Sequence, residues 1–292
     1  MKISVVIVNK DEATLADTLD ALGSAQPGLI DEIVVVDASQ RRLDHIRQDH
    51  PEVVWLDYEQ PEGVRVTIPH QRNAGVALAT GDVIVFTDSG CIPKEDWLPR
   101  LLAPILEDGE DIAGGPAIAN GTNIYSGSHW WGNSDEKYVD SIATINIAFR
   151  REAFDAVGGF DERFGAGEDL DFCWRLVDAG YQLRWVPNAM VEHEWGDARR
   201  QLRRSYFYGV GWARLLRKHP RRLKKALRET PVALIYPLYL LGLPLTFKYR
   251  KYPLLLLIPL WRSRTEDRPF LVLLDHLVQG VGVIAEVTGL YR

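Results

Sequence analysis

Several polar residues of this sequence directly follow apolar runs, where side chains can meet a ligand. The clearest is Asp37, which ends the run EIVVVD. A carboxylate there can accept hydrogen bonds from ribose hydroxyls or a base, and helix capping is the alternative. Arg72 and Asn73 are predicted to open a helix, where a guanidinium and free backbone N–H groups suit a phosphate. An ordinary surface charge is the alternative for Arg72.

A second group places three carboxylates, Glu168, Asp169 and Asp171, within four residues. They stand at a predicted helix N-terminus, where the helix dipole stabilises negative charge, and capping explains only one of them. On the same helix, Trp174 and Arg175 are expected to pack or pair near this group. A position in the hydrophobic core is the alternative for Trp174.

Three further residues are candidates for contact with a sugar. Trp130 and Trp131 follow His129 in a Gly/Asn/Ser-rich stretch, residues 120–134, which is typical of a long surface loop. A flat indole is a natural stacking face for a pyranose ring. Asn146, at the start of a predicted strand, is the third candidate.

The first 120 residues contain the elements that would position these side chains. Continuous apolar runs alternate with segments of helical spacing, which predicts an open, mostly parallel α/β sheet covered by helices. Ligands of such sheets bind beyond the carboxyl ends of the strands. The runs span residues 3–8, 32–37, 53–56 and 82–86, and the polar clusters at their ends span residues 9–12, 37–39 and 88–90.

Residues 121–198 are less regular but still belong to this first domain, predicted to span residues 1–198. We expect a strand over residues 145–150, a helix from about Glu168 to Ala179, and short strands near residues 183–186 and 189–193.

The net charge of −6 conceals two opposed parts of the 292-residue chain. Residues 1–198 carry 15 Lys and Arg against 35 Asp and Glu, whereas residues 199–292 carry 19 against 5. The composition otherwise resembles that of a folded protein and excludes collagen-like and disordered classes. Only Cys91 and Cys173 are present, so neither a disulfide framework nor a thiolate zinc site is expected. A reducing compartment is the default, and the N-terminal apolar run is too short for a signal peptide.

The second predicted domain, residues 199–292, has the features of a membrane-surface attachment. Residues 199–228 hold twelve Lys or Arg and no acidic residue, with an apolar stripe at helical spacing. Uncharged runs follow at residues 230–247 and 252–261, too short or too rich in proline for a clear span. Segments that lie in the bilayer surface are therefore expected, with a soluble helical domain as the alternative. Anionic lipid suits these apolar neighbours better than nucleic acid does.

Five motifs then resemble, in order and spacing, those of family 2 glycosyltransferases of the GT-A fold. They begin with MKISVVIVNKDEATL and EIVVVDAS, continue with RNAGVALATGDVIVFTDSGCIPKEDWL and NIAFRREAFDAVGGFDERFGAGEDLDFCWRL, and end with VEHEW. The resemblance covers about residues 1–195. It implies a nucleotide-sugar donor, bound by residues Asn9, Glu12, Asp37, Arg72, Asn73, Asp88 and Ser89.

The resemblance also implies a divalent cation, Mn²⁺ or Mg²⁺. Asp88 matches the first carboxylate of a D-x-D motif, which holds the cation against the donor diphosphate. The sequence departs from that motif, because Asp88-Ser89-Gly90 lacks the second carboxylate. His193 matches a further metal ligand, and an imidazole would favour Mn²⁺.

In the resemblance, Asp169 is the base that removes the proton from the acceptor hydroxyl during inverting transfer, and Glu168 is the second choice. The expected activity is transfer of a single sugar to a hydroxyl acceptor, a lipid-linked or cell-envelope glycan, at the cytoplasmic face of the cell membrane. The protein would be peripheral or monotopic. The alternatives are a non-catalytic membrane-associated nucleotide- or glycan-binding protein and a nucleotidylyltransferase, which normally has a Gly-rich loop that VIVNKDEATL lacks.

Overall fold

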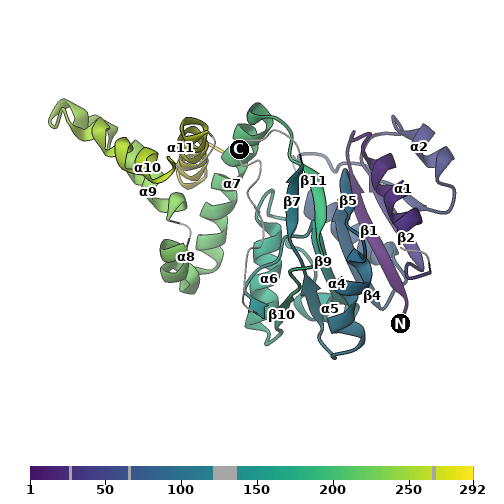
Figure 1. The fold of residues 1–292 in the computed structure, drawn as a ribbon. Helices are drawn as coiled ribbons and strands as arrows, with labels where there is room; N and C mark the ends of the chain where they lie inside the picture. The colour runs from purple at the N-terminus through teal and green to yellow at the C-terminus, as the bar shows by residue number, and fades with distance from the viewer. Residues whose placement is uncertain (26–27, 65–66, 121–136, 230, 265–267, 292) are drawn as a thin grey trace. The chain divides into compact units, whose positions relative to one another are not determined.

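The computed structural model describes the chain except residues 26–27, 65–66, 121–136, 230, 265–267 and 292 (Figure 1). The described residues form two compact units. Unit 1 comprises the described residues up to Glu194, and unit 2 begins at Trp195.

Unit 1 is built on an eight-stranded sheet in the order β3-β2-β1-β4-β9-β6-β10-β8. The strands β1 to β4 are mutually parallel, whereas β9 runs antiparallel between β4 and β6. The expectation of a mostly parallel α/β sheet is therefore confirmed. The strands are β1 (Ile3–Asn9), β2 (Glu32–Asp37), β3 (Val54–Asp57), β4 (Val83–Asp88), β6 (Ile112–Gly114), β8 (Tyr138–Val139), β9 (Asn146–Arg150) and β10 (Leu183–Trp185).

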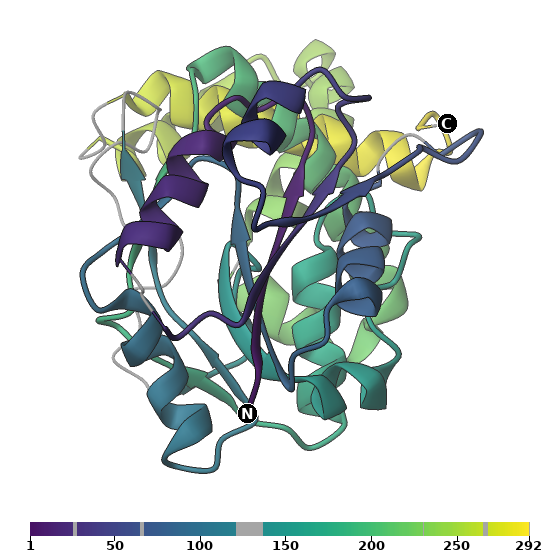
Figure 2. The same cartoon turned by 90° about the vertical axis from the view of Figure 1, so that its right-hand side faces the viewer.

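Helices cover both faces of this sheet (Figure 2). Figure 2 shows α1 and α4 on one side of β1, and α3, α5 and α6 on the other. The second side holds an aromatic core in which Phe149 stacks on Phe154 and Phe160 packs on Phe172, with ring centroids 5.7 and 4.5 Å apart. The helices are α1 (Leu15–Ala25), α2 (Asp44–Asp49), α3 (Ile68–Leu78), α4 (Trp97–Leu106), α5 (Arg151–Val157) and α6 (Glu168–Asp178).

A glycine allows α3 to lie close against the sheet. A Cβ atom on Gly75 would stand 2.5 Å from Cγ1 of Val6 in β1. Such a contact is shorter than van der Waals packing permits, so α3 can keep this distance only with glycine at the position. The approach matters because α3 carries Arg72 and Asn73.

A second, three-stranded sheet has the order β5-β11-β7. It pairs β11 (Val191–Glu194) antiparallel to β5 (Cys91–Pro93) and parallel to β7 (Ala117–Asn120). In this register His193 lies opposite Cys91. The sequence motif VEHEW is thus brought beside the residues that follow β4.

Unit 2 is helical. Its longest helices, α7 (Ala198–Lys218) and α11 (Pro269–Val287), cross at a point of backbone contact, because a Cβ on Gly209 would stand 2.0 Å from the carbonyl oxygen of Gln279. By length and composition α11 is the one helix in the described ranges that could cross a membrane. The remaining segments are η1 (Pro220–Arg222), α8 (Leu223–Glu229), α9 (Val232–Leu241), η2 (Leu243–Phe247), η3 (Tyr252–Leu256) and α10 (Leu257–Arg262).

Candidate active site

A network of short polar side chains forms where β1, β2 and β4 end. The register pairs Asn9 with Asp37 at the carboxyl ends of β1 and β2. The amide of Asn9 donates to Oδ1 of Asp37 at 3.0 Å, and the hydroxyl of Ser89 donates to Oδ1 of Asn9 at 2.8 Å. Ser39 donates to the same oxygen of Asp37 from both its hydroxyl and its backbone N–H. Three predicted donor-binding residues, Asn9, Asp37 and Ser89, are therefore joined, and Asp37 does not cap a helix.

Arg72 joins two parts of the site that lie far apart in the sequence. Its guanidinium is 2.5 Å from Oε1 of Glu168, at the start of α6, and 3.6 Å from Oδ1 of Asp88, at the end of β4. The residue is only 5% exposed, and its guanidinium lies near the rings of Phe86 and Phe160. Burial alone would lower the pKa of Arg72, but the negative charges of Glu168, Asp88 and Asp169 raise it. Arg72 therefore carries a fixed positive charge between the strand ends and α6.

The position of Arg72 within α3 corrects one expectation. The helix begins at Ile68, so Arg72 and Asn73 lie a full turn inside it and do not stand at its N-terminus. The free N–H groups of a helix belong to its first turn, so these two residues contribute none to a phosphate. Arg72 makes its contacts through its side chain.

The three crowded carboxylates of α6 have three different environments. Glu168 is buried and paired with Arg72, whereas Asp171 is fully buried and pairs with Arg175 at 2.8 Å. Asp169 is half-buried and accepts a hydrogen bond from the backbone N–H of Leu170, at 2.8 Å. Among the described residues, no arginine or lysine forms an ion pair with Asp169. It is the carboxylate of the three that remains available to a ligand.

The surroundings of Asp169 also change its acidity. Desolvation and the negative charge of Glu168 raise the pKa of Asp169 to about 7, against the partial opposition of Arg72. The group is thus close to half-protonated at neutral pH. A carboxylate with such a pKa can remove a proton from a hydroxyl group that is placed beside it.

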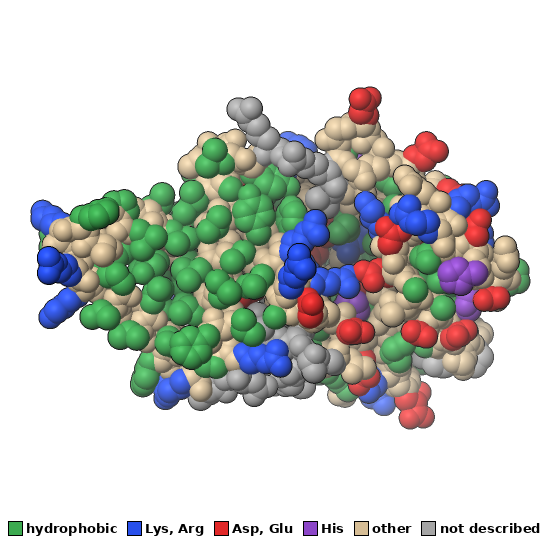
Figure 3. All heavy atoms as spheres, turned by 90° about the horizontal axis from the view of Figure 1, so that it is seen from above, with side chains coloured by type: hydrophobic (Ala, Val, Ile, Leu, Met, Phe, Trp, Pro, Cys, Tyr) green, Lys and Arg blue, Asp and Glu red, His purple; other side chains and the backbone are tan. Residues whose placement is uncertain are grey.

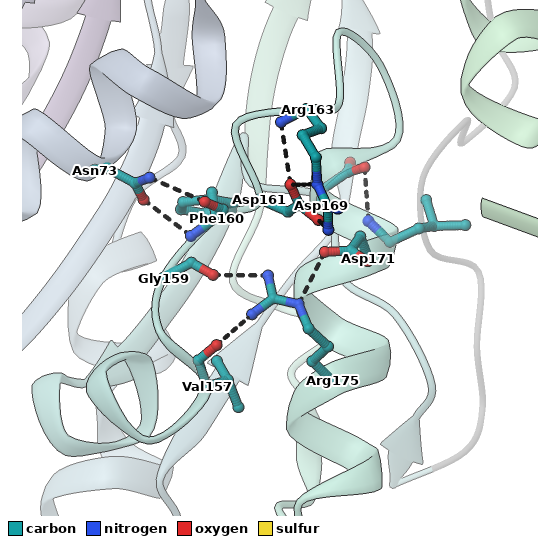
Figure 4. A network of polar contacts seen from close by, with 10 residues as sticks. Asn73, Val157, Gly159, Phe160, Asp161, Arg163, Asp169, Asp171 and Arg175 are labelled. Carbon is teal, nitrogen blue, oxygen red and sulfur yellow. Dashed lines mark hydrogen bonds and ion pairs between the residues drawn. The ribbon is translucent and has the colours of Figure 1, made fainter. Parts of the chain in front are cut away.

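Two sets of hydrogen bonds hold the segment that leads into α6 (Figure 4). The amide of Asn73 donates to the carbonyl oxygen of Phe160 and its Oδ1 accepts the Phe160 N–H, both at 2.9 Å. Arg175 donates to the carbonyl oxygens of Val157 and Gly159, each at 2.6 Å, and to Asp171. Asn73 therefore ties α3 to the segment that precedes Asp169, and Arg175 ties α6 to the same segment.

The residues implied in cation binding come from β4 and β11. Asp88 ends β4 with its side chain about one third exposed, at 34%. The next turn passes through Gly90, whose φ is +82°, and a Cβ there would stand 3.8 Å from Cε1 of His193. Nδ1 of His193 lies 3.7 Å from Sγ of Cys91. A carboxylate at the end of β4 and an imidazole on β11, which pairs with the following strand β5, suit a divalent cation such as Mn²⁺.

Those two groups do not complete a metal site by themselves. The described part of the chain contains no group of three His, Cys, Asp or Glu residues that could hold an ion. A cation bound by Asp88 and His193 would therefore need oxygen atoms from a ligand, which is common for Mg²⁺ and related ions bound with phosphates.

Two predicted acceptor-binding residues have structural roles instead. Asn146 is 0% exposed, and its amide donates to the carbonyl oxygens of Pro116 and Ala189 while accepting from the indole of Trp97. With the side chain enclosed and each polar atom bonded, Asn146 cannot contact a sugar. Arg175 is likewise committed to the three bonds described above.

The remaining predicted binding residues are Trp174, Glu12, Trp130 and Trp131. Trp174 is buried, which agrees with the alternative of a core position, and Glu12 is half-buried in the turn between β1 and α1. Trp130 and Trp131 lie outside the described residues.

Sequence reasoning missed two positioning features. It did not foresee the pairing of Arg72 with Glu168 or the bonds from Asn73 to Phe160. The pair Gly158-Gly159 was the available signal, because two successive glycines favour a tight turn before Phe160. In the structure both glycines have positive φ, of 73° and 69°.

The chain is similar to known proteins over both units. A family model described as "Glycosyl transferase family 2" matches residues 3–157, and one described as "Glycosyl transferase family group 2" matches residues 127–274. The pre-mycofactocin glycosyltransferase of Mycobacterium tuberculosis is 37% identical over 169 residues, which cover 51% of this chain and 35% of that protein. The glucosyl-dolichyl phosphate glucuronosyltransferase of Haloferax volcanii is 22% identical over 221 residues, which cover 66% and 69%. The chain thus spans about a third of the mycobacterial relative's length.

Solved structures show the same fold. The mannosyltransferase PcManGT from Pyrobaculum calidifontis, in complex with GDP-Man and Mn²⁺, has a TM-score of 0.64 at 17% identity, covering 98% of this chain and 87% of that one. GalNAc-T7 with UDP, GalNAc and Mn²⁺ has a TM-score of 0.55 at 22% identity, covering 66% and 43%. The expected GT-A fold is confirmed. Since the first family model matches more than half of the sequence, and the polar strand ends lie where its motifs predict, the chain belongs to glycosyl transferase family 2.

Proposed function

We propose that unit 1 transfers a single sugar from a nucleotide-sugar donor to a hydroxyl acceptor, with inversion, and that Asp169 is the catalytic base. The observation that carries the proposal is the position of Arg72. Its buried guanidinium forms ion pairs with both Asp88, at the end of β4, and Glu168, at the start of α6. The residues implied in donor binding and the residue implied in proton transfer are thereby fixed with respect to each other.

On the donor side, Asp88 and His193 would hold a divalent cation, which supplies charge neutralisation to a departing diphosphate. Two structural neighbours of the same fold were solved with Mn²⁺, one with GDP-Man and one with UDP, which supports a nucleotide-sugar donor and Mn²⁺. Arg72 is too enclosed to act mainly as a phosphate ligand. We assign it the role of positioning Asp88 and Glu168. The hydrogen-bonded network of Asn9, Asp37 and Ser39 would bind the donor's nucleoside.

On the acceptor side, Asp169 accepts the proton of the attacking hydroxyl. Proton transfer is most effective when the pKa of the base lies near the working pH, and the pKa of Asp169 is about 7. Glu168 is a weaker candidate because Arg72 already pairs with its carboxylate. In an inverting reaction the hydroxyl attacks the anomeric carbon as the bond to the diphosphate breaks, and the proton passes to Asp169.

The acceptor class proposed is a lipid-linked or cell-envelope glycan. This choice is supported by the apolar surface of unit 2, discussed below, which suits an enzyme working next to a bilayer.

The decisive experiment compares Asp169→Asn with Asp178→Asn, which changes an exposed carboxylate at the other end of α6. Hydrolysis and transfer of a panel of nucleotide sugars are measured with Mn²⁺. We expect Asp169→Asn to lose at least about a hundredfold in kcat, the scale of general-base catalysis, and Asp178→Asn to retain activity. Undiminished turnover of Asp169→Asn would show that the base is wrongly assigned.

Calorimetry on the same variants separates catalysis from binding. Both should bind a nucleoside diphosphate in a Mn²⁺-dependent manner, whereas Asp88→Asn should lose the metal-dependent part. If the unmodified protein shows no metal-dependent binding, a non-catalytic role as a binding protein becomes the better description.

A further inference from the structure

Residues 232–261 of unit 2 form a helical hairpin with an exposed apolar surface. One arm is α9 followed by η2, the other is η3 followed by α10, and residues 248–251 connect them. The hydroxyl of Tyr252 donates to the carbonyl oxygen of Tyr239 at 2.9 Å, and the two rings stack with centroids 5.3 Å apart. The start of the second arm is therefore bonded back onto the first.

The apolar side chains of both arms point to solvent. Phe247 is 96% exposed, Leu238 67% and Trp261 64%. Further exposed side chains on the hairpin are Ile235, Leu241, Leu243, Leu245, Leu254, Leu255, Leu257 and Ile258. A soluble monomer rarely exposes so large a contiguous apolar area, and such areas mark sites of interaction with proteins or membranes.

The charges on the hairpin favour a membrane over a protein as the partner. No Asp or Glu occurs between Glu229 and Glu266, whereas Lys248, Arg250 and Lys251 fill the connection between the arms. In Figure 3, hydrophobic side chains cover the part of unit 2 formed by this hairpin, and basic side chains gather at its outer end. Apolar and aromatic side chains with basic residues at their margin suit the acyl chains and anionic headgroups of one leaflet.

The basic helix α7, which belongs to the region expected to attach to a membrane, packs on α11. Val210 and Ala213 of its apolar stripe are buried within unit 2, and Gly209 beside them contacts the backbone of α11. Arg214 and Arg217 on the same helix pair with Glu286 of α11, at 3.0 and 3.3 Å. No large apolar side chain of α7 is as exposed as those of the hairpin.

The packing of α7 on α11 also determines what α11 can do. If α11 crossed a bilayer, the helix packed alongside it would have to enter as well. Helix α7 carries seven Lys or Arg in its first and last two turns, and those that cannot reach the interface cost up to about 2.5–3.5 kcal/mol each in the hydrocarbon. The pair is therefore more stable outside the hydrocarbon.

From these observations we propose that the hairpin of residues 232–261 inserts into one leaflet of an anionic bilayer, parallel to its surface, and attaches the protein there. Proline at positions 237 and 244 interrupts the first arm. The second arm has only eleven residues, from Tyr252 to Arg262, about half of what a helical span requires. Both arms can bury their apolar side chains among the upper acyl chains while the connecting lysines and arginine reach phosphate groups.

A cysteine-labelling experiment tests this directly, because both native cysteines are buried. Phe247→Cys and, as the control, Leu106→Cys on α4 of unit 1 are labelled with an environment-sensitive fluorophore. Vesicles of phosphatidylcholine with about one third phosphatidylglycerol are then added. We expect a blue shift at position 247 and none at position 106. An unchanged spectrum at position 247 would overturn the proposal.

Vesicle flotation with charge-changing variants provides the second test. Phe247→Glu and the triple replacement of Lys248, Arg250 and Lys251 by Gln should each weaken vesicle binding by about tenfold or more, a loss of roughly 1.4 kcal/mol. Leu106→Glu should bind as the unmodified protein does. If instead Phe247→Glu abolishes a dimer seen by light scattering without lipid, and vesicles bind neither protein, a second copy covers the hairpin and the proposal is wrong. Metal-dependent nucleoside diphosphate binding, measured without lipid, reports on unit 1 separately.

Discussion

Asp169 and Glu168 are neighbours in sequence that have different electrostatic surroundings. Glu168 is paired with Arg72, whereas Asp169 is kept from ionising freely by burial and by the charge of Glu168. Arg72 acts on both carboxylates, and its own positive charge is fixed by them. The acidity of the proposed base is therefore a property of three residues, and changing either neighbour should change it.

The pH dependence of transfer follows from this arrangement. The proposed base acts when deprotonated, so kcat/KM should rise with pH through about 7, the pKa of the Asp169 carboxyl group. In Glu168→Gln the nearby negative charge is lost and Arg72 is released toward Asp169, and both effects lower the pKa of Asp169. The rising limb should move to lower pH by about one unit. A limb that stays in place, or moves to higher pH, would contradict this account. Asp178→Asn is the control.

At the scale of elements, α3 and α6 are held together by contacts with the segment between α5 and α6. Asn73 provides the contact from α3, through two hydrogen bonds to the backbone of Phe160. Arg175 provides the contact from α6 (Figure 4). The positions of Arg72 and Asp169 thus depend on the turn that precedes α6. The bonds that hold this turn come from Asn73 and Arg175, not from Arg72 or Asp169.

Replacing Asn73 by Ala should loosen that turn. The Phe160 N–H and carbonyl oxygen lose their partners, which costs about 1–3 kcal/mol of unfolding free energy. As a positioning residue, Asn73 should affect kcat by about tenfold without moving the pH limb set by Asp169. The control is Glu162→Ala, which removes the exposed bond to Asn73 together with the contact to His70 and should cost less than about 0.5 kcal/mol. A normal kcat in a folded Asn73→Ala protein would count against a positioning role.

The crossing of α7 and α11 offers a test in unit 2. Alanine at position 209 would place Cβ 2.0 Å from the carbonyl oxygen of Gln279, so the helices must separate. We expect Gly209→Ala to destabilise this pair by about 1–3 kcal/mol, seen as faster hydrogen exchange of the α11 amides.

The same substitution at Gly23 provides the control. This residue lies in α1 and has no atom within 4 Å of the added carbon. Gly23→Ala should be neutral or stabilise by about 0.5–1 kcal/mol, since alanine favours helix. Equal effects of the two substitutions would show that helix propensity, and not the crossing, sets the response.

Local patterns predicted the elements well where apolar periodicity is strong. The strands β1, β2, β4 and β9 and the helix α6 lie within a few residues of their predicted bounds. The small sheet of β5, β7 and β11 was not foreseen in full, because strands of three or four residues carry little periodicity. The helix α11 was also missed, because Asp275 and Glu286 interrupt its apolar sequence and their partners come from α7.

The site was predicted as residue types and not as contacts. Motif order suggested Asp88, Asp169 and His193, but the pairing of Arg72 with Glu168 joins residues 96 positions apart. Asn146 shows the converse error, since a polar residue in a motif proved to be an internal bonding partner for Pro116, Ala189 and Trp97. Sequence gives the type of a polar group, and only the tertiary fold decides whether it meets solvent, a ligand or the backbone.

At the scale of the whole molecule, the uneven distribution of charge corresponds to two proposed roles. The acidic residues of the proposed reaction lie in unit 1, and the basic residues beside the exposed apolar hairpin lie in unit 2. Each role depends on a different kind of ion. A divalent cation would act at Asp88 and His193, and monovalent salt would screen the hairpin from anionic lipid.

Chelation and salt should therefore have separable effects. Removing divalent cations should abolish transfer and leave vesicle flotation unchanged. Raising monovalent salt to about 1 M should reduce flotation by about tenfold, and transfer to a small soluble acceptor should fall much less. If chelation releases the protein from vesicles, the cation instead bridges protein and lipid, and the assignment of the two roles to two units is wrong.

The antiparallel strand β9 has a consequence for how this chain folds during synthesis. It lies between β4 and β6, yet the ribosome makes it after both. Until residues 146–150 emerge, β4 has an unpaired edge and β6 has no neighbour that links it to the growing sheet. Exposed strand edges promote association between chains. Residues 146–150 thus pair both edges at once, and until they are made the centre of the sheet of unit 1 stays open.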